Sequence, residues 1–327
     1  MIRLCEVAPE YDIVCAGSLP GLAINREGYS FPVGKVEILH MFPMNFKEFL
    51  MAMDNDHLIN SIEESFKSNK ELALHDKALE LYRTYLVVGG MPEAVKTYLD
   101  NKDFTFVKAK QMYINETYAR DMAKYSTRTE AKRADAAYNS IPFQLAKENR
   151  KFQYNLIKSG ARAKDYESSL DWLKTAGIVL QCTKVKEGKL PLNFYIDSLS
   201  YKVYMSDVGL LTAKNDSIPM NIIADKNIGA EAKGALTENY IAQQLAFNEI
   251  PLYYWESDST AKVDFVWQGD ETVMPIEVKS SDNVKAKSLM QFVKKYEPKY
   301  SIRISAKNFG FENKIKSVPL YAVWCIK

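Results

Sequence analysis

The feature that most constrains this chain is a pair of short alternating segments near its C-terminus. Residues 262–267 read Lys-Val-Asp-Phe-Val-Trp, and residues 274–279 read Met-Pro-Ile-Glu-Val-Lys. Alternation of apolar and polar residues predicts two half-buried β-strands. A turn over residues 268–271 would let them pair, so that Asp264 lies beside Glu277. Glu277 and Lys279 are two residues apart and therefore project from one face of their strand.

Two carboxylates and a lysine on one sheet face can hold a divalent cation and activate water for phosphodiester cleavage. We expect Asp264 and Glu277 to ligate Mg²⁺, and Lys279 to orient the water or stabilise the phosphate. Oxygen ligands without His or Cys favour Mg²⁺ or Mn²⁺ over zinc. The alternative is an exposed Glu–Lys pair on a sheet surface. Glu-x-Lys occurs six times in the chain, but only the triplet at Glu277 follows an aspartate in a preceding strand.

Length and composition set the outer limits. A chain of 327 residues is long enough for two or three domains. Its net charge of +2 gives no general attraction to polyanions, so a nucleic-acid site has to be local. The four cysteines are scattered without a Cys-x-x-Cys pair, which favours a reducing compartment and argues against structural zinc. We expect a cytoplasmic protein with no membrane span, because no apolar run is long enough.

The middle of the chain carries the local positive charge. Residues 46–141 predict helices, and residues 142–215 carry a winged-helix pattern: a helix over 163–176, then strands over 178–185 and 190–195 around a turn at 187–189. Residues 147–189 hold ten basic and five acidic side chains, a net charge of +5. Duplex DNA is the predicted partner, through phosphate contacts from Lys158, Arg162, Lys164, Lys186 and Lys189. The alternative, weighted equally, is a winged helix used for domain packing, with a lysine-rich solvated face.

Several segments resemble one family. Residues 16–22 (Ala-Gly-Ser-Leu-Pro-Gly-Leu), 28–35, 85–93 and 276–279 are similar to prokaryotic AAA-family predicted ATPases that carry a winged-helix segment and a C-terminal PD-(D/E)xK nuclease-like module. The resemblance implies an α/β multi-domain protein. Its parts would be a remnant of the AAA-type ATPase core (1–45), a helical lid (46–141), a winged helix (142–215) and a restriction-endonuclease-like α/β domain (229–327). It also implies a catalytic acid at Glu238, on the helix that precedes the strand pair.

The same resemblance bears on ATP. Intact family members bind ATP through a Gly-rich phosphate loop, which this chain lacks. Residues 28–36 have five residues between the glycines and Val36 where a Ser or Thr would contact Mg²⁺. By resemblance, Ser18 takes the place that senses the γ-phosphate, and Arg26 and Lys35 face the nucleotide or a neighbouring subunit. The alternative, favoured without a phosphate loop, is that these are ordinary loop residues. We therefore expect an N-terminally incomplete family member that neither binds nor hydrolyses ATP.

These patterns support one leading functional hypothesis and two alternatives. In the leading hypothesis the winged helix holds DNA and a Mg²⁺ site at Asp264, Glu277, Lys279 and Glu238 cuts it. In the first alternative, intact family members are ATP-driven switches and the C-terminal fold is a binding scaffold. In the second, the chain is a non-catalytic interaction protein, for example one half of a toxin–antitoxin-like or defence system. Substrate, pathway and oligomeric state, including a homo-oligomer, stay open.

Overall fold

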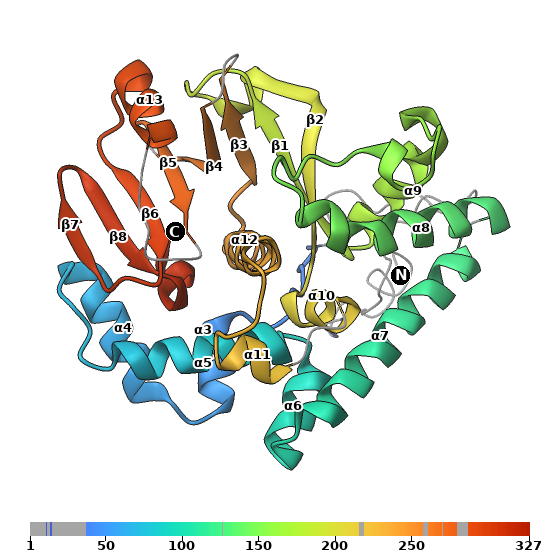
Figure 1. Ribbon diagram of the computed structural model, residues 1–327, viewed down its shortest axis with the longest axis horizontal. Helices are drawn as coiled ribbons and strands as arrows, with labels where there is room; N and C mark the ends of the chain where they lie inside the picture. Colours follow the sequence, from blue (N-terminus) through green and yellow to red (C-terminus); the bar gives the residue numbers. More distant parts are fainter. Residues whose placement is uncertain are drawn as a thin grey trace.

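The computed structural model describes residues 11, 14, 37–125, 127–215, 219–257, 261–269, 271–279 and 287–327. This part of the chain is α/β, with helices dominating the first half and strands the second (Figure 1). The α-helices are α3 (Phe46–Ala52), α4 (Asp56–Ser68), α5 (His75–Val88), α6 (Pro92–Asn101), α7 (Phe104–Tyr125), α8 (Arg128–Leu145), α9 (Ala163–Thr175), α10 (Val208–Lys214), α11 (Pro219–Ile223), α12 (Ala230–Phe247) and α13 (Lys287–Tyr296). The 3-10 helices are η1 (Tyr154–Leu156), η2 (Leu192–Tyr195) and η3 (Leu320–Cys325). The strands are β1 (Val179–Val185), β2 (Ile196–Met205), β3 (Tyr253–Glu256), β4 (Lys262–Gln268), β5 (Val273–Val278), β6 (Ser301–Ser305), β7 (Gly310–Glu312) and β8 (Ile315–Pro319).

The eight described strands form one mixed sheet, in the order β2-β1-β3-β4-β5-β6-β8-β7. Strands β1 and β3 run parallel, with Thr183 paired to Tyr253, whereas β4 and β5 form the predicted antiparallel pair. The sheet thus has strands on both sides of residues 216–228, a segment whose polar residues predict a linker between two domains. The β1–β2 hairpin of the predicted winged helix belongs to this shared sheet, because β1 pairs with β3. Strand β2 forms one edge of the sheet.

Helices cover both faces of the sheet. On one face, α12 contacts β1 and β2 and contributes Tyr240 to a large core that includes Phe265 and Ile276. On the other face, α13 contacts β4 and β5, and its Phe292 packs in a smaller core with Val273. Because side chains alternate along a regular strand, membership of one core or the other shows which face a residue of β5 projects from: Ile276 belongs to the large core and Val273 to the smaller one.

Helix α12 lies at the centre of the molecule, where Figure 1 shows it end-on. Its buried amide side chains hydrogen-bond to the backbone of other segments. Asn239 accepts from the Met205 amide at 2.8 Å, Gln243 from Val208 at 3.0 Å, and Gln244 from Phe46 at 2.9 Å. Buried polar groups are tolerated when they have partners. These bonds therefore fix α3 and the β2–α10 connection around α12.

A pair of glycines makes the corner between α5 and α10 possible. Gly89 ends α5 with a φ of 71°, and a Cβ there would lie 2.3 Å from Asp207 Oδ1 and 2.8 Å from the Gly209 Cα. The buried Asp207 carboxylate accepts hydrogen bonds from the amides of Gly90 at 2.6 Å and Leu210 at 2.9 Å. Burial raises the pKa of Asp207 although these amides oppose the shift. Residues 89–92 read Gly-Gly-Met-Pro, which predicts a break between two helices, and in the structure this break is a close backbone crossing.

Some predicted elements were wrong. Residues 192–195, expected within a strand over 190–195, form a 3-10 helix that follows Pro191. The apolar segment 320–326 also predicts a strand, but residues 320–325 form a 3-10 helix that follows Pro319. Short apolar runs do not distinguish a buried strand from a buried helical turn. The apolar segment 11–18 predicts a further buried strand, of which the structure describes only Tyr11 and Val14. In the described part of the chain, no helix combines the length and apolarity that a membrane crossing requires.

Candidate functional site

The β4–β5 pair brings the predicted acids close together. Phe265 pairs with Ile276, so Asp264 and Glu277 come next along the two strands. Between β3 and β4 the register shifts: Tyr253 pairs with Val266, but Trp255 pairs with Val263. Two β4 residues, Asp264 and Phe265, therefore lie opposite one residue of β3. This is a β-bulge, a feature that re-aims side chains and often occurs beside functional sites.

The surroundings of the two carboxylates differ. Asp264 Oδ2 accepts a hydrogen bond from the Val278 amide at 2.9 Å. Glu277 is buried, with Oε1 at 3.2 Å from Lys279 Nζ. Its Oε2 has no hydrogen-bond partner among the described residues, and the Arg303 Nε lies 4.0 Å away. Burial raises the pKa of Glu277 and the charge of Asp264 adds to the rise, while Lys279 and Arg303 oppose it.

Glu238, the third predicted acid, is held elsewhere. It is fully buried on α12, and Lys202 Nζ lies 2.5 Å from its Oε1. The hydroxyl of Tyr204 also donates to Oε1, and Arg150 donates to Oε2. The structure therefore differs from the expectation of an acid beside a metal: both oxygens are taken by cations and a hydroxyl of the protein. The physical reason is that a carboxylate this deeply buried needs charge compensation.

The sheet itself separates these groups. Ile276 faces α12 in the large core, so alternation turns Glu277 to the opposite face, toward α13. Glu238 projects from α12, on the other side. Within the described residues, no three or more His, Cys, Asp or Glu side chains lie close enough together to hold a metal ion. Glu238 therefore does not join Asp264 and Glu277, the two predicted Mg²⁺ ligands, in one donor set.

A cluster of cations accompanies Glu238 instead. Lys202 is fully buried, and burial lowers its pKa to about 7. Burial also lowers the pKa of Lys262, which Asp264 partly offsets, and Lys262 Nζ donates to the Asn149 carbonyl at 3.0 Å. Gly234 leaves room for Arg150, since a Cβ there would lie 2.4 Å from Arg150 Nη2. The α12 side of the sheet is therefore rich in positive side chains, and these oppose the binding of a metal cation there.

Arg150 and Lys202 were not among the predicted site residues. Lys202 was visible as a lone lysine in the apolar strand segment 201–205, where a buried cation requires a buried acid. Arg150 gave no such signal, because its loop is polar throughout.

The predicted DNA-contacting residues fall into two groups. Lys158, Arg162 and Lys164 are exposed around the start of α9, and within the described residues their side chains form no ion pairs. Helix α9 packs on α8, and Arg133 of α8 lies 3.9 Å from Asp165 in the first turn of α9. This first group remains free to meet phosphates.

The second group lies beside α13. Lys186 and Lys189 flank Gly188, where a Cβ would lie 2.5 Å from the Phe292 ring. Glu187 accepts a hydrogen bond from the Tyr296 hydroxyl at 3.0 Å, and Lys189 lies 3.6 Å from the same carboxylate. The predicted wing is therefore docked on α13, although Lys186 and Lys189 are exposed. Ser18, Arg26 and Lys35, the residues assigned to the nucleotide, lie outside the described residues.

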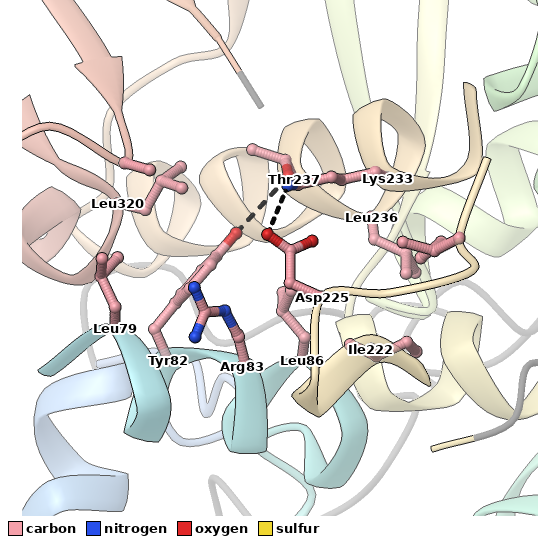
Figure 2. Close-up of a pocket in the computed structure, with 12 residues that line it drawn as sticks. Leu79, Tyr82, Arg83, Leu86, Ile222, Asp225, Lys233, Leu236, Thr237 and Leu320 are labelled. Carbon is pink, nitrogen blue, oxygen red and sulfur yellow. Dashed lines mark hydrogen bonds and ion pairs between the residues drawn. The ribbon is translucent and has the colours of Figure 1, made fainter. Parts of the chain in front are cut away.

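A small cavity lies below α12, between α5 and the segment around α11 (Figure 2). The Lys233 ammonium lies 2.8 Å from Asp225, and the Tyr82 hydroxyl lies 3.5 Å from Thr237 Oγ1. Its volume of about 30 Å³ suits a water molecule and is far below that of an organic-ligand site.

Two family models match the chain. Residues 79–218 match a domain of unknown function, DUF8612, and residues 233–323 match a second domain of unknown function, DUF4143. DUF4143 is found in AAA-ATPase-associated proteins. No curated protein and no solved structure gives a significant match. Strands β1 and β2 fall in the first match and β3 to β8 in the second, so the shared sheet joins the two.

Proposed function

We propose that this chain is the DNA-binding part of an AAA-family ATPase, with a winged helix at its centre and a PD-(D/E)xK nuclease-like C-terminal module that binds without cutting. The observation that carries the binding is the free cationic group at α9: Lys158, Arg162 and Lys164 are exposed and unpaired within the described residues. Phosphates are favoured at a helix N-terminus, where backbone amides and the helix dipole add to the basic side chains.

The state of the acids argues against cleavage. Glu238 is neutralised by Arg150 and Lys202, and Glu277 lies across the sheet from it. A divalent cation would meet two carboxylates, Asp264 and Glu277, beside Lys279 and Arg303. Lys279 lies 3.2 Å and Arg303 4.0 Å from the Glu277 carboxylate, and positive side chains so close oppose the binding of a further cation. A module that binds DNA without cutting it is therefore better supported than an active Mg²⁺-dependent nuclease.

DNA binding is tested by fluorescence anisotropy with a labelled duplex over a range of salt concentrations. Each phosphate contact contributes about −0.9 to the slope of log affinity against log salt. Changing Lys158, Arg162 and Lys164 together to Glu should weaken binding strongly and flatten the slope by up to about three units. The matched control is the same triple change at Lys67, Lys70 and Lys77, exposed lysines of α4, the α4–α5 loop and α5. Equal effects of the two triple variants would refute the α9 site.

Cleavage is tested with the same DNA in millimolar Mg²⁺ or Mn²⁺. We expect intact DNA and no rise in the thermal unfolding temperature on adding either ion, because an ion that binds the native state stabilises it. Cation-dependent cleavage that disappears in Glu277→Ala would show that the module is an active nuclease.

A further inference from the structure

A second, larger cavity opens between α8, α10 and α12. It is a groove of about 490 Å³ lined by residues that include Asn139, Phe143, Lys214 and Ala235. This volume is within the usual range of small-molecule sites, roughly 300–1,000 Å³. None of its lining residues belongs to the acid cluster or to the α9 basic group.

One positive charge dominates the groove. Lys214 is the charged residue among those lining it, and its Nζ donates to Asn139 Oδ1 and lies 4.6 Å from the Tyr138 ring centroid. Burial lowers the pKa of Lys214, and the charge of Asp135 partly offsets the shift. No carboxylate of the described residues forms an ion pair with this lysine. A partly desolvated ammonium with neutral partners attracts an anion.

Five of the eight lining residues are apolar, and Asn139 and Asn215 line the groove beside Lys214. Pro142, Ala146, Ala232 and Ala235 contribute short side chains, and Phe143 is 45% exposed at the edge. The alanine side chains are short and leave space in the groove, and the exposed ring of Phe143 offers a stacking surface. The room left by these side chains suits a flat apolar group.

The start of α12 adds to the attraction for an anion. Ala232 lies in the first turn, and the N-cap residue Gly229 makes no side-chain hydrogen bond to that turn. First-turn amides have no partner within a helix and carry the positive end of its dipole. Glu231 is in the same turn but is exposed, so its charge is screened by solvent.

We propose that this groove binds a small organic anion: a planar apolar body that carries one phosphate or carboxylate group. Lys214 and the α12 amides would hold the anionic group, and Phe143 would stack on the body. The proposal is independent of DNA binding at α9, because no residue is shared.

Calorimetry on the full chain tests it with three probes: thymidine monophosphate, thymidine and benzoate. We expect saturable binding of thymidine monophosphate, benzoate or both, and none of thymidine. Binding of the monophosphate alone would identify a phosphate-bearing ligand, and binding of benzoate alone a carboxylate.

Variants locate the site. Lys214→Met and Phe143→Ala should each weaken binding by about tenfold or more, since loss of a charged contact or a stacking surface is worth at least about 1.4 kcal/mol. Asn139→Asp adds a negative charge beside Lys214 without a change in size and should abolish binding. Controls are Lys174→Met and Phe194→Ala, an exposed lysine and an exposed aromatic elsewhere. The proposal fails if no probe binds, if thymidine binds as well as the anions, or if Asn139→Asp binds normally.

Discussion

At the scale of single residues, the structure is governed by how buried charge is compensated. Glu238 and Lys202 have no solvent exposure, and Arg150 reaches the same carboxylate from the loop after α8. Removing one partner of such a group leaves the other charge buried, which costs about 3–5 kcal/mol. The acid therefore joins three segments of the chain: α12, β2 and the loop after α8.

Gly234 offers a direct test of this arrangement. In an exposed helix interior, Gly→Ala stabilises by about 0.5–1 kcal/mol. Here the new methyl would meet Arg150 Nη2 at 2.4 Å, so we expect Gly234→Ala to displace the guanidinium and destabilise the protein. In an Arg150→Ala background the same change should stabilise it. Urea unfolding of the wild type, the two single variants and the double variant gives the coupling energy. A stabilising effect in both backgrounds would show that Arg150 does not depend on this gap.

Glu277 predicts a dependence of stability on pH. Burial raises its folded-state pKa above the ordinary 4.5, so the native state binds more protons than the unfolded state between 4.5 and the raised value. Stability contributed by Glu277 is therefore lost as pH rises through this interval. Relative to wild type, Glu277→Gln should gain stability from acid to neutral pH.

Glu187→Gln is the control for that measurement. Although burial acts in the opposite direction, Tyr296 and Lys295 lower the pKa of Glu187. The Gln variant should therefore lose stability, relative to wild type, as pH rises over the acid range. Urea unfolding of both variants at acid and at neutral pH measures the two changes in stability. If both variants changed stability in the same direction, the opposite pKa shifts of Glu277 and Glu187 would be contradicted.

At the scale of elements, the α5–α10 corner depends on backbone shape. Gly89→Ala meets two obstacles, a φ of 71° and contact with Asp207 and Gly209. We expect a loss of at least about 2 kcal/mol in unfolding free energy. Gly177→Ala has a φ of 68° in open space and should lose only about 1 kcal/mol. Gly310→Ala, with open space and no positive φ, should change little. If Gly89→Ala lost no more unfolding free energy than Gly177→Ala, the backbones of residues 89 and 209 would not be in close contact.

The same corner shows what sequence reasoning can and cannot reach. Alternation predicted β4 and β5, and the break at residues 89–92 was predicted from glycine and proline, because both signals are local. The partners of Glu238 lie far away in sequence, on β2 and in the loop after α8, so no local pattern reveals them. The resemblance suggested a role for Glu238, but not the cations that surround it. Sheet membership of β1 was missed because parallel pairing leaves no turn signal.

At the scale of the whole molecule, one sheet and one large core join the two regions matched by family models. Asn239, Gln243 and Gln244 bind the backbone of segments outside the second region. We therefore expect a single unfolding transition, with calorimetric and van't Hoff enthalpies in agreement. Residues 229–327 produced alone should lack cooperative unfolding, and co-production with residues 1–228 should restore it. Two resolved transitions in the intact chain would mean that the regions are separate domains.

The parallel pairing of β1 with β3 also sets an order of events during synthesis. Thr183 cannot meet Tyr253 until the whole of α12 has left the ribosome. Until then, one edge of β1 presents unpaired amides and carbonyls, the kind of template on which chains associate. Contacts between residues distant in sequence also form slowly. We therefore expect that chaperone binding matters most while residues 1–252 have been made and β3 has not. A ribosome pause before residue 253 would lengthen the time during which the edge of β1 is unpaired.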